Sequence, residues 1–226
     1  MQEKYRTQIA GYWDPELKMS TWTTIELLNL KCWEPSIWAM AQHSLEDKPG
    51  CPFPWRHVYQ QTSIIEREIG HEVEAYVRFL SEIFPTGLWH KGLASSDLVE
   101  CWTALCIKRS VLDINSLAYE IADILRLWSV DLADRIEVGY THGQVAEPLT
   151  WGLRAHGWWN QWNESHLSML VPCKISGAVG TGIAVHPDLP RMVEEALQVN
   201  MAQVSSQIVP RVHLTACLNQ VGTRAA

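Results

Sequence analysis

Apolar residues recur at helical spacing along most of this chain, and clusters of proline and glycine interrupt the pattern. The PGCPFP stretch at 49–54 cannot continue a helix, and Pro85 and Gly87 stop the segment that follows it. Residues 139–147 break the pattern again, and residues 171–187 are typical of a loop. The segments with helical spacing are residues 17–45, 58–84, 148–169 and 188–199, with a further helix expected from about Ser205. Together they predict an all-α fold.

The longest uninterrupted segment runs from Ser96 to about Ile136 and contains neither proline nor glycine. A helix of that length would extend ~60 Å at about 1.5 Å per residue, far beyond an ordinary globular helix. Ser95 or Ser96 suits its N-cap, and Asp97 and Glu100 are favourable in its first turn. We therefore expect a bundle of long helices.

The helical pattern predicts two domains: a small N-terminal helical domain at residues 1–94 and part of a central long-helix bundle at residues 95–226. Two long helices cannot close a bundle by themselves, because their apolar faces would remain as exposed patches. We therefore expect the chain to form a homo-oligomer, to pair with another polypeptide, or to be part of a longer protein.

The composition narrows the range of functions. A net charge of −7 with 18 basic residues argues against binding nucleic acid through phosphates. None of the six cysteines has C-x-x-C spacing, which argues against a zinc site, and no apolar run approaches the ~20 residues that span a bilayer. Because no secretory signal pattern is visible, we expect a cytoplasmic protein with reduced thiols and no membrane contact. Of the twelve tryptophans, five recur in helical context and are interpreted as helix-packing bulk in preference to a ligand cage: Trp128, Trp151, Trp158, Trp159 and Trp162.

Four short polar segments lie at breaks between the expected helices. Histidine titrates near neutrality and glycine lets a ligand approach the backbone, so such segments suit proton transfer or anion binding. Structural interpretations stay open as well: a lone histidine is more often structural, the second segment serves equally as a helix cap, and the fourth lacks the G-K-S/T ending of a P-loop. The segments are GHEVEA (70–75), WHKGLASSD (89–97), YTHGQVAEP (140–148) and KISGAVGTG (174–182).

Taken in order, these segments resemble adenylosuccinate lyase, within the fumarase/aspartase superfamily. GHEVEA resembles the family's His-Asp-Val-x-Ala, and HKGLASSD resembles His-x-Gly-x-Thr-Ser-x-Asp. THGQVAEP resembles Thr-His-Gly-Gln-Pro-Ala-x-Pro, and KISGAVGT matches the family's pattern residue for residue. KY at 4–5 resembles the family's basic-Tyr opening, and SSQIV at 205–209 resembles Ser-Thr-Gln-Val-Val. The resemblance covers nearly the whole chain.

The resemblance implies a lyase that cleaves a C–N bond by β-elimination and releases fumarate, without a metal or organic cofactor. His142 would be the acid that protonates the departing nitrogen, and His71 would support it. Ser95, Ser96, Thr141 and Gln144 would bind or orient the succinyl carboxylates. The other positions that the resemblance assigns to substrate binding are Lys4, Tyr5 and His90, associated with the nucleotide phosphate, and Lys174, Ser176, Gly177 and Gln207, which would line the site.

Departures from the family's pattern leave a second function open. Ala94 stands where the family has threonine, Val145 stands where it has proline, and Pro210 interrupts a polar helical stretch. The family's Gly-Ser-Ser-x-Met-Pro loop, which carries the serine proposed as base, does not occur among the 226 residues. A non-catalytic nucleotide-binding or interaction protein is therefore the alternative to a lyase.

The leading expectation is a lyase for adenylosuccinate or a related succinyl-amine in purine biosynthesis. Such a lyase would be incomplete without a partner or a C-terminal half, and the resemblance implies a homotetramer whose active sites combine segments of three subunits. A lyase for another succinyl-amine is a third possibility, because Ala94 and Trp89 alter the site.

Overall fold

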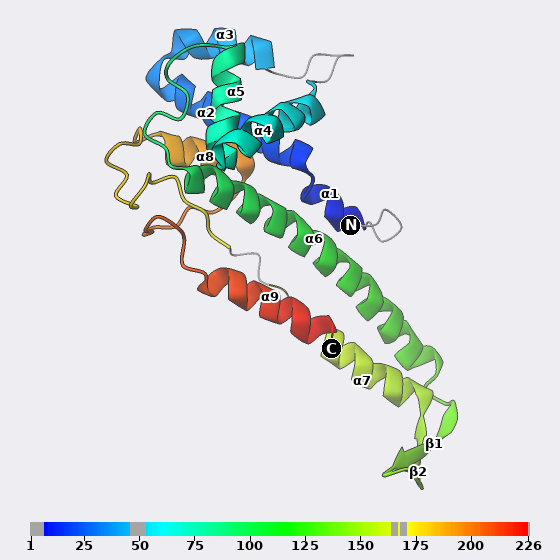
Figure 1. The fold of residues 1–226 in the computed structure, drawn as a ribbon. Helices are drawn as coiled ribbons and strands as arrows, with labels where there is room; N and C mark the ends of the chain where they lie inside the picture. Colours follow the sequence, from blue (N-terminus) through cyan, green and yellow to red (C-terminus); the bar gives the residue numbers. More distant parts are fainter. Residues whose placement is uncertain (1–6, 46–52, 164–166, 168–170, 226) are drawn as a thin grey trace. The chain divides into compact units, whose positions relative to one another are not determined.

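The computed structural model describes residues 7–45, 53–163, 167 and 171–225. The chain divides into two compact units, of which unit 1 comprises Met1–Arg109 and Leu170–His213, and unit 2 comprises Ser110–Met169 and Leu214–Ala226. The fold is helical, as the sequence predicts, and the described residues add one two-stranded sheet (Figure 1). The expected domain boundary between residues 94 and 95 stays a prediction.

Unit 1 is built on α2 (Pro15–Trp33), which packs against α3 (Pro35–Leu45), α4 (Trp55–Ile69) and α8 (Leu189–Leu197). Its core is centred on Trp22 and Tyr76, which are fully buried and meet edge to face with ring centroids 5.5 Å apart. Trp22 thus supplies packing bulk to this core. The tryptophans expected in that role behave differently, because Trp128, Trp151 and Trp158 are 49%, 44% and 40% exposed. The helices of unit 1 are α1 (Gln8–Tyr12), α2 (Pro15–Trp33), α3 (Pro35–Leu45), α4 (Trp55–Ile69), α5 (Glu72–Ile83), the first part of α6 (Ser95–Asp131) and α8 (Leu189–Leu197).

Two segments expected as single helices are each two helices. Residues 17–45 divide at Pro35, because proline restricts the residue before it and Glu34 leaves the helical region with φ −146°. Residues 58–84 divide at Gly70, which adopts a left-handed φ of +71° and ends α4. His71 then has an extended backbone and is the N-cap of α5, so the break between the two helices places this histidine at a helix N-terminus.

Unit 2 consists of the rest of α6, a hairpin of β1 (Ile136–Thr141) and β2 (Gln144–Thr150), α7 (Trp151–Asn163) and most of α9 (Val212–Ala225). The expected long helix is confirmed, with 37 residues ending at Asp131. Arg224 on α9 donates a hydrogen bond to Asn115 Oδ1 on α6 (3.1 Å). Gly152 at the start of α7 lies so close to α6 that a Cβ there would approach Ser129 O to 2.6 Å.

The hairpin corrects the expectation of a helix from Pro148. Pro148 lies in β2, paired with Val138, and the helix begins only at Trp151. Thr150 provides the start signal, because its Oγ1 accepts a hydrogen bond from the backbone N–H of Leu153 (3.1 Å). The last helix begins at Val212 and not near Ser205, because Pro210 cannot take an interior helical position. Residues 171–187 form a loop, as expected, and 188–199 contain α8.

Candidate active site

His71 connects the start of α5 to the start of α6. It is the N-cap of α5, where its Nδ1 accepts a hydrogen bond from the backbone N–H of Glu74 (3.1 Å). The neutral ring therefore carries its proton on Nε2, which lies 3.3 Å from Ser95 Oγ. When Nε2 donates to Ser95, the hydroxyl proton of Ser95 can be donated to a bound acceptor.

Ser95 and Ser96 form the first turn of α6, where backbone N–H groups and the helix dipole favour a negative charge. Ser96 Oγ is buried and has no hydrogen-bond partner among the described residues. Buried hydroxyls are normally satisfied, so this one is a further potential donor. Two hydroxyls at a helix N-terminus suit a carboxylate ligand.

Asp97, in the same turn, holds the loop at 174–177 in place. Its fully buried carboxylate accepts hydrogen bonds from Lys174 Nζ (2.7 Å) and from the backbone N–H groups of Ser176 (3.0 Å) and Gly177 (3.1 Å). Lys174 Nζ also donates to Gly177 O (2.7 Å), and the lysine side chain is 1% exposed. The ammonium group of Lys174 therefore stabilises the conformation of this loop.

Close backbone approaches bring three loops together in unit 1. Gly92 has a φ of +77°, and a Cβ there would lie 2.0 Å from Ala184 O. Gly180 has a φ of +82°, and a Cβ there would lie 2.2 Å from Ser205 O. Only glycine fits both requirements, a left-handed backbone and no side chain. Ser176 Oγ lies 2.8 Å from Ser205 Oγ, so the loop at 174–182 also bonds the segment that carries Gln207.

His90, which is half-buried, forms an ion pair with the fully buried Glu26 of α2. Its Nδ1 lies 2.7 Å from Glu26 Oε1, and its backbone N–H donates to Glu26 Oε2 (2.8 Å). Burial by itself would lower the pKa of His90, but the hydrogen bond and the charge of Glu26, together with the charges of Asp97 and Glu74, outweigh it and raise the pKa. The left-handed φ of +59° at His90 is unusual for a residue with a side chain, and the two bonds to Glu26 hold it.

Lys18 of α2 lies beside Glu72, the residue after His71. Its ammonium pairs with Glu72 and lies 5.3 Å from the ring centroid of Trp22 and 5.5 Å from that of Trp102. Such cation–π contacts favour a fixed ammonium position. Three aromatic rings, including Tyr59 at 5.8 Å, thus surround a cation of the chain itself.

His142 occupies the tip of the hairpin in unit 2. β1 ends at Thr141 and β2 begins at Gln144, and these two residues are register partners, so the loop contains only His142 and Gly143. Both have positive φ, +52° and +73°, the requirement of a type I′ turn. The Thr-His-Gly-Gln segment is therefore a two-residue hairpin, and the imidazole is exposed at its tip.

The structure brings some of the expected site residues together. His71, His90, Ser95, Ser96, Lys174, Ser176 and Gly177 belong to unit 1, in contacts that link α2, α5, α6 and the loop at 174–182. Gln207 is exposed in the same unit. Thr141, His142 and Gln144 belong to unit 2 and are exposed. Lys4 and Tyr5 lie outside the described residues. The substrate roles of all these residues stay predictions.

Sequence reasoning missed the supporting residues Glu26 and Lys18, and it gave Asp97 only a role in the helix dipole. The position of Glu26 in the apolar run TIELL could have indicated its role, because a carboxylate on an apolar helix face needs a cationic or hydrogen-bonding partner. The hairpin was missed too, although a His-Gly pair between two short alternating runs is a recognisable turn pattern.

Among the described residues, no group of three or more His, Cys, Asp and Glu side chains could hold a metal ion. Within the same ranges, no helix has the length and apolar character that crossing a membrane requires.

Comparison with known proteins identifies similar sequences. A family model described as "Lyase" matches residues 58–223. An adenylosuccinate lyase of Aquifex aeolicus is 27% identical over 237 residues, covering 100% of this chain and 54% of that protein. The adenylosuccinate lyase of Bacillus subtilis is 26% identical over 221 residues, covering 93% of this chain and 50% of that protein. The chain thus spans about half the length of these curated relatives.

Solved structures share the fold. A fumarate lyase from Mesorhizobium sp. BNC1 superposes with a TM-score of 0.81 at 16% identity, covering 96% of this chain and 53% of that one. A 3-carboxy-cis,cis-muconate lactonizing enzyme from Pseudomonas putida gives a TM-score of 0.77 at 16% identity, covering 95% of this chain and 52% of that one.

Proposed function

Because this chain belongs to the lyase family matched over residues 58–223, we propose that it contributes to a β-elimination that releases fumarate from adenylosuccinate or a related succinyl-amine. Lyase-family membership and the adenylosuccinate lyases among its relatives support this class of reaction. The observation that carries the proposal is the contact of His71 Nε2 with Ser95 Oγ at the N-terminus of α6, because it joins two of the matching segments in one anion-binding arrangement.

In the proposed site, Ser95 and Ser96 bind a succinyl carboxylate. The His71 ring orients the Ser95 hydroxyl by donating to its oxygen, so that the hydroxyl proton is directed to the carboxylate. The Asp97–Lys174 pair fixes the neighbouring loop, which limits the reorganisation that substrate binding requires. Ser176, Gly177 and Gln207 line the substrate, whereas Lys174 acts through the loop.

His142 is proposed as the general acid. Protonation of the departing nitrogen needs a proton donor that the substrate can reach, and the imidazole of His142 is exposed at the tip of the hairpin. Thr141 and Gln144, which flank the turn, are proposed to orient the substrate. Lys4, Tyr5 and His90 are proposed to contact the phosphate. The raised pKa of His90 favours the cationic ring that such a contact uses.

The proton acceptor is proposed to come from a segment outside these 226 residues, because the family's Gly-Ser-Ser-x-Met-Pro loop does not occur among them. A second polypeptide or a C-terminal half would supply it within a homo-oligomer, a tetramer by resemblance. The active assembly is proposed to be cytoplasmic and to use no cofactor.

The test is complementation. The purified chain is mixed with the C-terminal half of the Bacillus subtilis adenylosuccinate lyase, and fumarate formation from adenylosuccinate is followed by ultraviolet absorbance. We expect fumarate only in the mixture, and His142→Gln should abolish it while leaving assembly unchanged. Assembly without fumarate in the wild-type mixture would contradict the proposal.

A non-catalytic nucleotide-binding protein is the second candidate, favoured by Ala94 at the family's threonine position. Loss of that hydroxyl removes a hydrogen bond to a charged group, which is worth about 1.5–3 kcal/mol. Calorimetry with AMP and adenylosuccinate separates the two candidates. Binding by the assembled mixture without turnover supports the second candidate. Restoration of turnover by Ala94→Thr would show that the missing threonine hydroxyl causes the loss of activity.

A further inference from the structure

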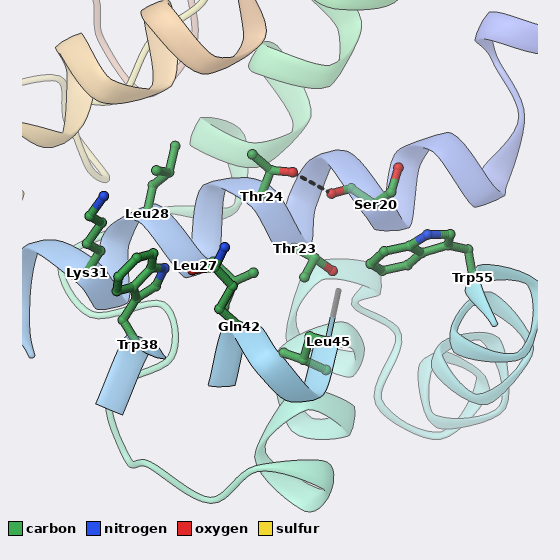
Figure 2. A pocket seen from close by; sticks show the side chains of 10 residues that line it. All are labelled: Ser20, Thr23, Thr24, Leu27, Leu28, Lys31, Trp38, Gln42, Leu45 and Trp55. Atoms are coloured by element: carbon green, nitrogen blue, oxygen red, sulfur yellow. Dashed lines mark hydrogen bonds between the residues drawn. The ribbon is translucent and has the colours of Figure 1, made fainter. Parts of the chain in front are cut away.

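A separate pocket lies between α2, α3 and the start of α4 in unit 1. It encloses about 660 Å³, within the size range of small-molecule sites. Figure 2 shows the ten side chains that line it, with Trp38 of α3 and Trp55 of α4 among its walls. Among the described residues, none of those predicted for the active site lines this pocket.

The pocket and the candidate active site use different faces of α2. At about 100° per residue, Ser20, Thr24 and Lys31 lie on one side of the helix, roughly opposite Lys18, Trp22 and Glu26. Glu26 bonds His90, and Lys18 pairs with Glu72, so that side belongs to the site already described. A ligand in the pocket would therefore contact neither His71 nor His90.

The hydroxyls in the pocket are arranged as acceptors. Within α2, Ser20 Oγ donates its proton to Leu17 O (3.0 Å). Thr24 Oγ1 donates to Ser20 O (3.0 Å; dashed line in Figure 2). Each hydroxyl therefore uses its only proton inside the helix and keeps lone pairs for another donor. A group that binds beside them must bring an N–H or O–H.

The cationic end of the pocket is Lys31, the one charged residue among the ten lining side chains that the structure describes. Its ammonium lies 4.4 Å from the ring centroid of Trp38, so the charge is held at an aromatic wall. Lys31 follows Thr24 by seven residues, which corresponds to about 10 Å along the helix axis. Leu28 lies between them on the same face, and its apolar surface separates the cation from the acceptors.

We propose that this pocket binds a planar aromatic acid that carries its carboxylate at one end and an N–H or O–H donor at the other. The carboxylate meets Lys31, the ring system lies against Leu28 and Trp38, and the donor reaches Thr24. Two fused rings with opposite substituents have a length comparable to the rise of about 10 Å along the helix axis from Thr24 to Lys31. The proposal is independent of the proposed lyase reaction, because it uses none of the same side chains.

The test is calorimetric titration of the full chain with 6-amino-2-naphthoate, which has both polar ends. Two matched probes each remove one end: 6-amino-2-naphthamide lacks the charge, and 2-naphthoate lacks the donor. We expect the aminonaphthoate to bind about tenfold more tightly than either matched probe. Equal affinities for the three probes, or no binding of any, would overturn the proposal.

Two variants assign the contacts. Lys31→Gln should remove the preference for the acid over the amide, and Thr24→Val should remove the preference for the amino compound over 2-naphthoate. Lys91→Gln is the matched control, because Lys91 also rests on a tryptophan, 4.0 Å from the ring centroid of Trp33, but does not line the pocket. Thermal unfolding confirms that each variant is folded.

The same titration is repeated with excess adenylosuccinate. Unchanged probe affinity is expected for a site on the other face of α2. Competition would assign the probe to the proposed active site and overturn the inference, without bearing on whether the lyase proposal is correct.

Discussion

At the scale of single residues, buried carboxylates organise unit 1. Glu26 and Asp97 are both fully buried, and each satisfies its oxygens with one cationic side chain and at least one backbone N–H. A buried charge is tolerated only with such partners. The sequence shows the acids but not their partners, because 64 residues separate Glu26 from His90 and 77 separate Asp97 from Lys174.

Replacement of Glu26 by glutamine should lower the pKa of His90, because it removes the hydrogen bond and the charge that raise this pKa against the effect of burial. NMR titration of the His90 ring measures the change. Replacement of Glu195 by glutamine is the control, because Glu195 pairs with Arg191 and not with His90, so it should leave the pKa of His90 unchanged.

The raised pKa of His90 also has a consequence for stability. A histidine whose folded-state pKa lies above its unfolded value stabilises the fold fully below the unfolded value, 6.5 for a model histidine, and loses this contribution as pH rises through the folded value. Wild-type unfolding free energy should therefore fall over this window more steeply than that of Glu26→Gln, at about 1.4 kcal/mol per unit of pKa difference. Parallel profiles would contradict the assignment.

Replacement of Asp97 by asparagine should destabilise unit 1 by about 3–5 kcal/mol, because the Lys174 ammonium would be left buried without its counter-charge. Urea unfolding measures the loss. Glu195→Gln is the matched control, since it removes an exposed pair with Arg191 worth about 0.3–0.5 kcal/mol. A loss from Asp97→Asn as small as that of the control would show that the loop does not depend on the pair.

At the scale of elements, breaks decide where chemistry is placed. Gly70 ends α4, so His71 becomes the N-cap of α5. The two-residue turn of His142 and Gly143 places the His142 side chain at the tip of the hairpin. Helical periodicity predicts α6 and α8, because long or strongly patterned segments depend little on tertiary context. It fails at the hairpin, because the two strands have only 6 and 7 residues and their apolar residues recur at the spacing of a strand and not at that of a helix.

Replacement of Gly143 by alanine should weaken the hairpin by about 1 kcal/mol, because a side chain disfavours its φ of +73°. A Cβ there would meet nothing within 4 Å, so the effect is purely conformational. Faster hydrogen exchange of the β1 and β2 amides is the expected result.

His142→Asn provides the comparison for Gly143→Ala. Asparagine tolerates a left-handed backbone, so the exchange rates of the hairpin should stay close to those of the wild type while the imidazole is lost. Equal weakening by both substitutions would show that the turn is not type I′.

At the scale of the whole molecule, apolar side chains remain exposed on α6 within unit 2. Leu117, Ile121, Ile124 and Trp128 are 56%, 38%, 49% and 49% exposed, and they follow one another at i, i+4, i+7 and i+11. That spacing places them in one stripe on the helix, and a continuous apolar stripe is typical of a face that another helix covers. The sequence predicts this need for partners, because two long helices cannot cover each other's apolar faces completely.

The chain should therefore self-associate, and Leu117→Glu with Ile124→Glu should shift it towards the monomer. Light scattering after size-exclusion chromatography measures the mass. Ile183→Glu is the control, because Ile183 is 88% exposed but lies in the loop of unit 1. A wild-type chain that is already monomeric at high concentration would contradict the prediction.

The short turn at His142 also constrains how this segment can change in evolution. Side chains alternate along a strand, so one residue added to or removed from β1 or the turn would reverse the direction of every side chain beyond it relative to the partner strand. The register already shifts by one residue at the bulge between Val138 and Tyr140. Gly139 lies in this bulge, where a Cβ would come within 2.4 Å of Glu147 O. Substitutions can accumulate on the exposed strands, but insertions and deletions between Ile136 and Thr150 should be strongly selected against. Selection should therefore act on the length of this segment more strongly than on the identity of its residues.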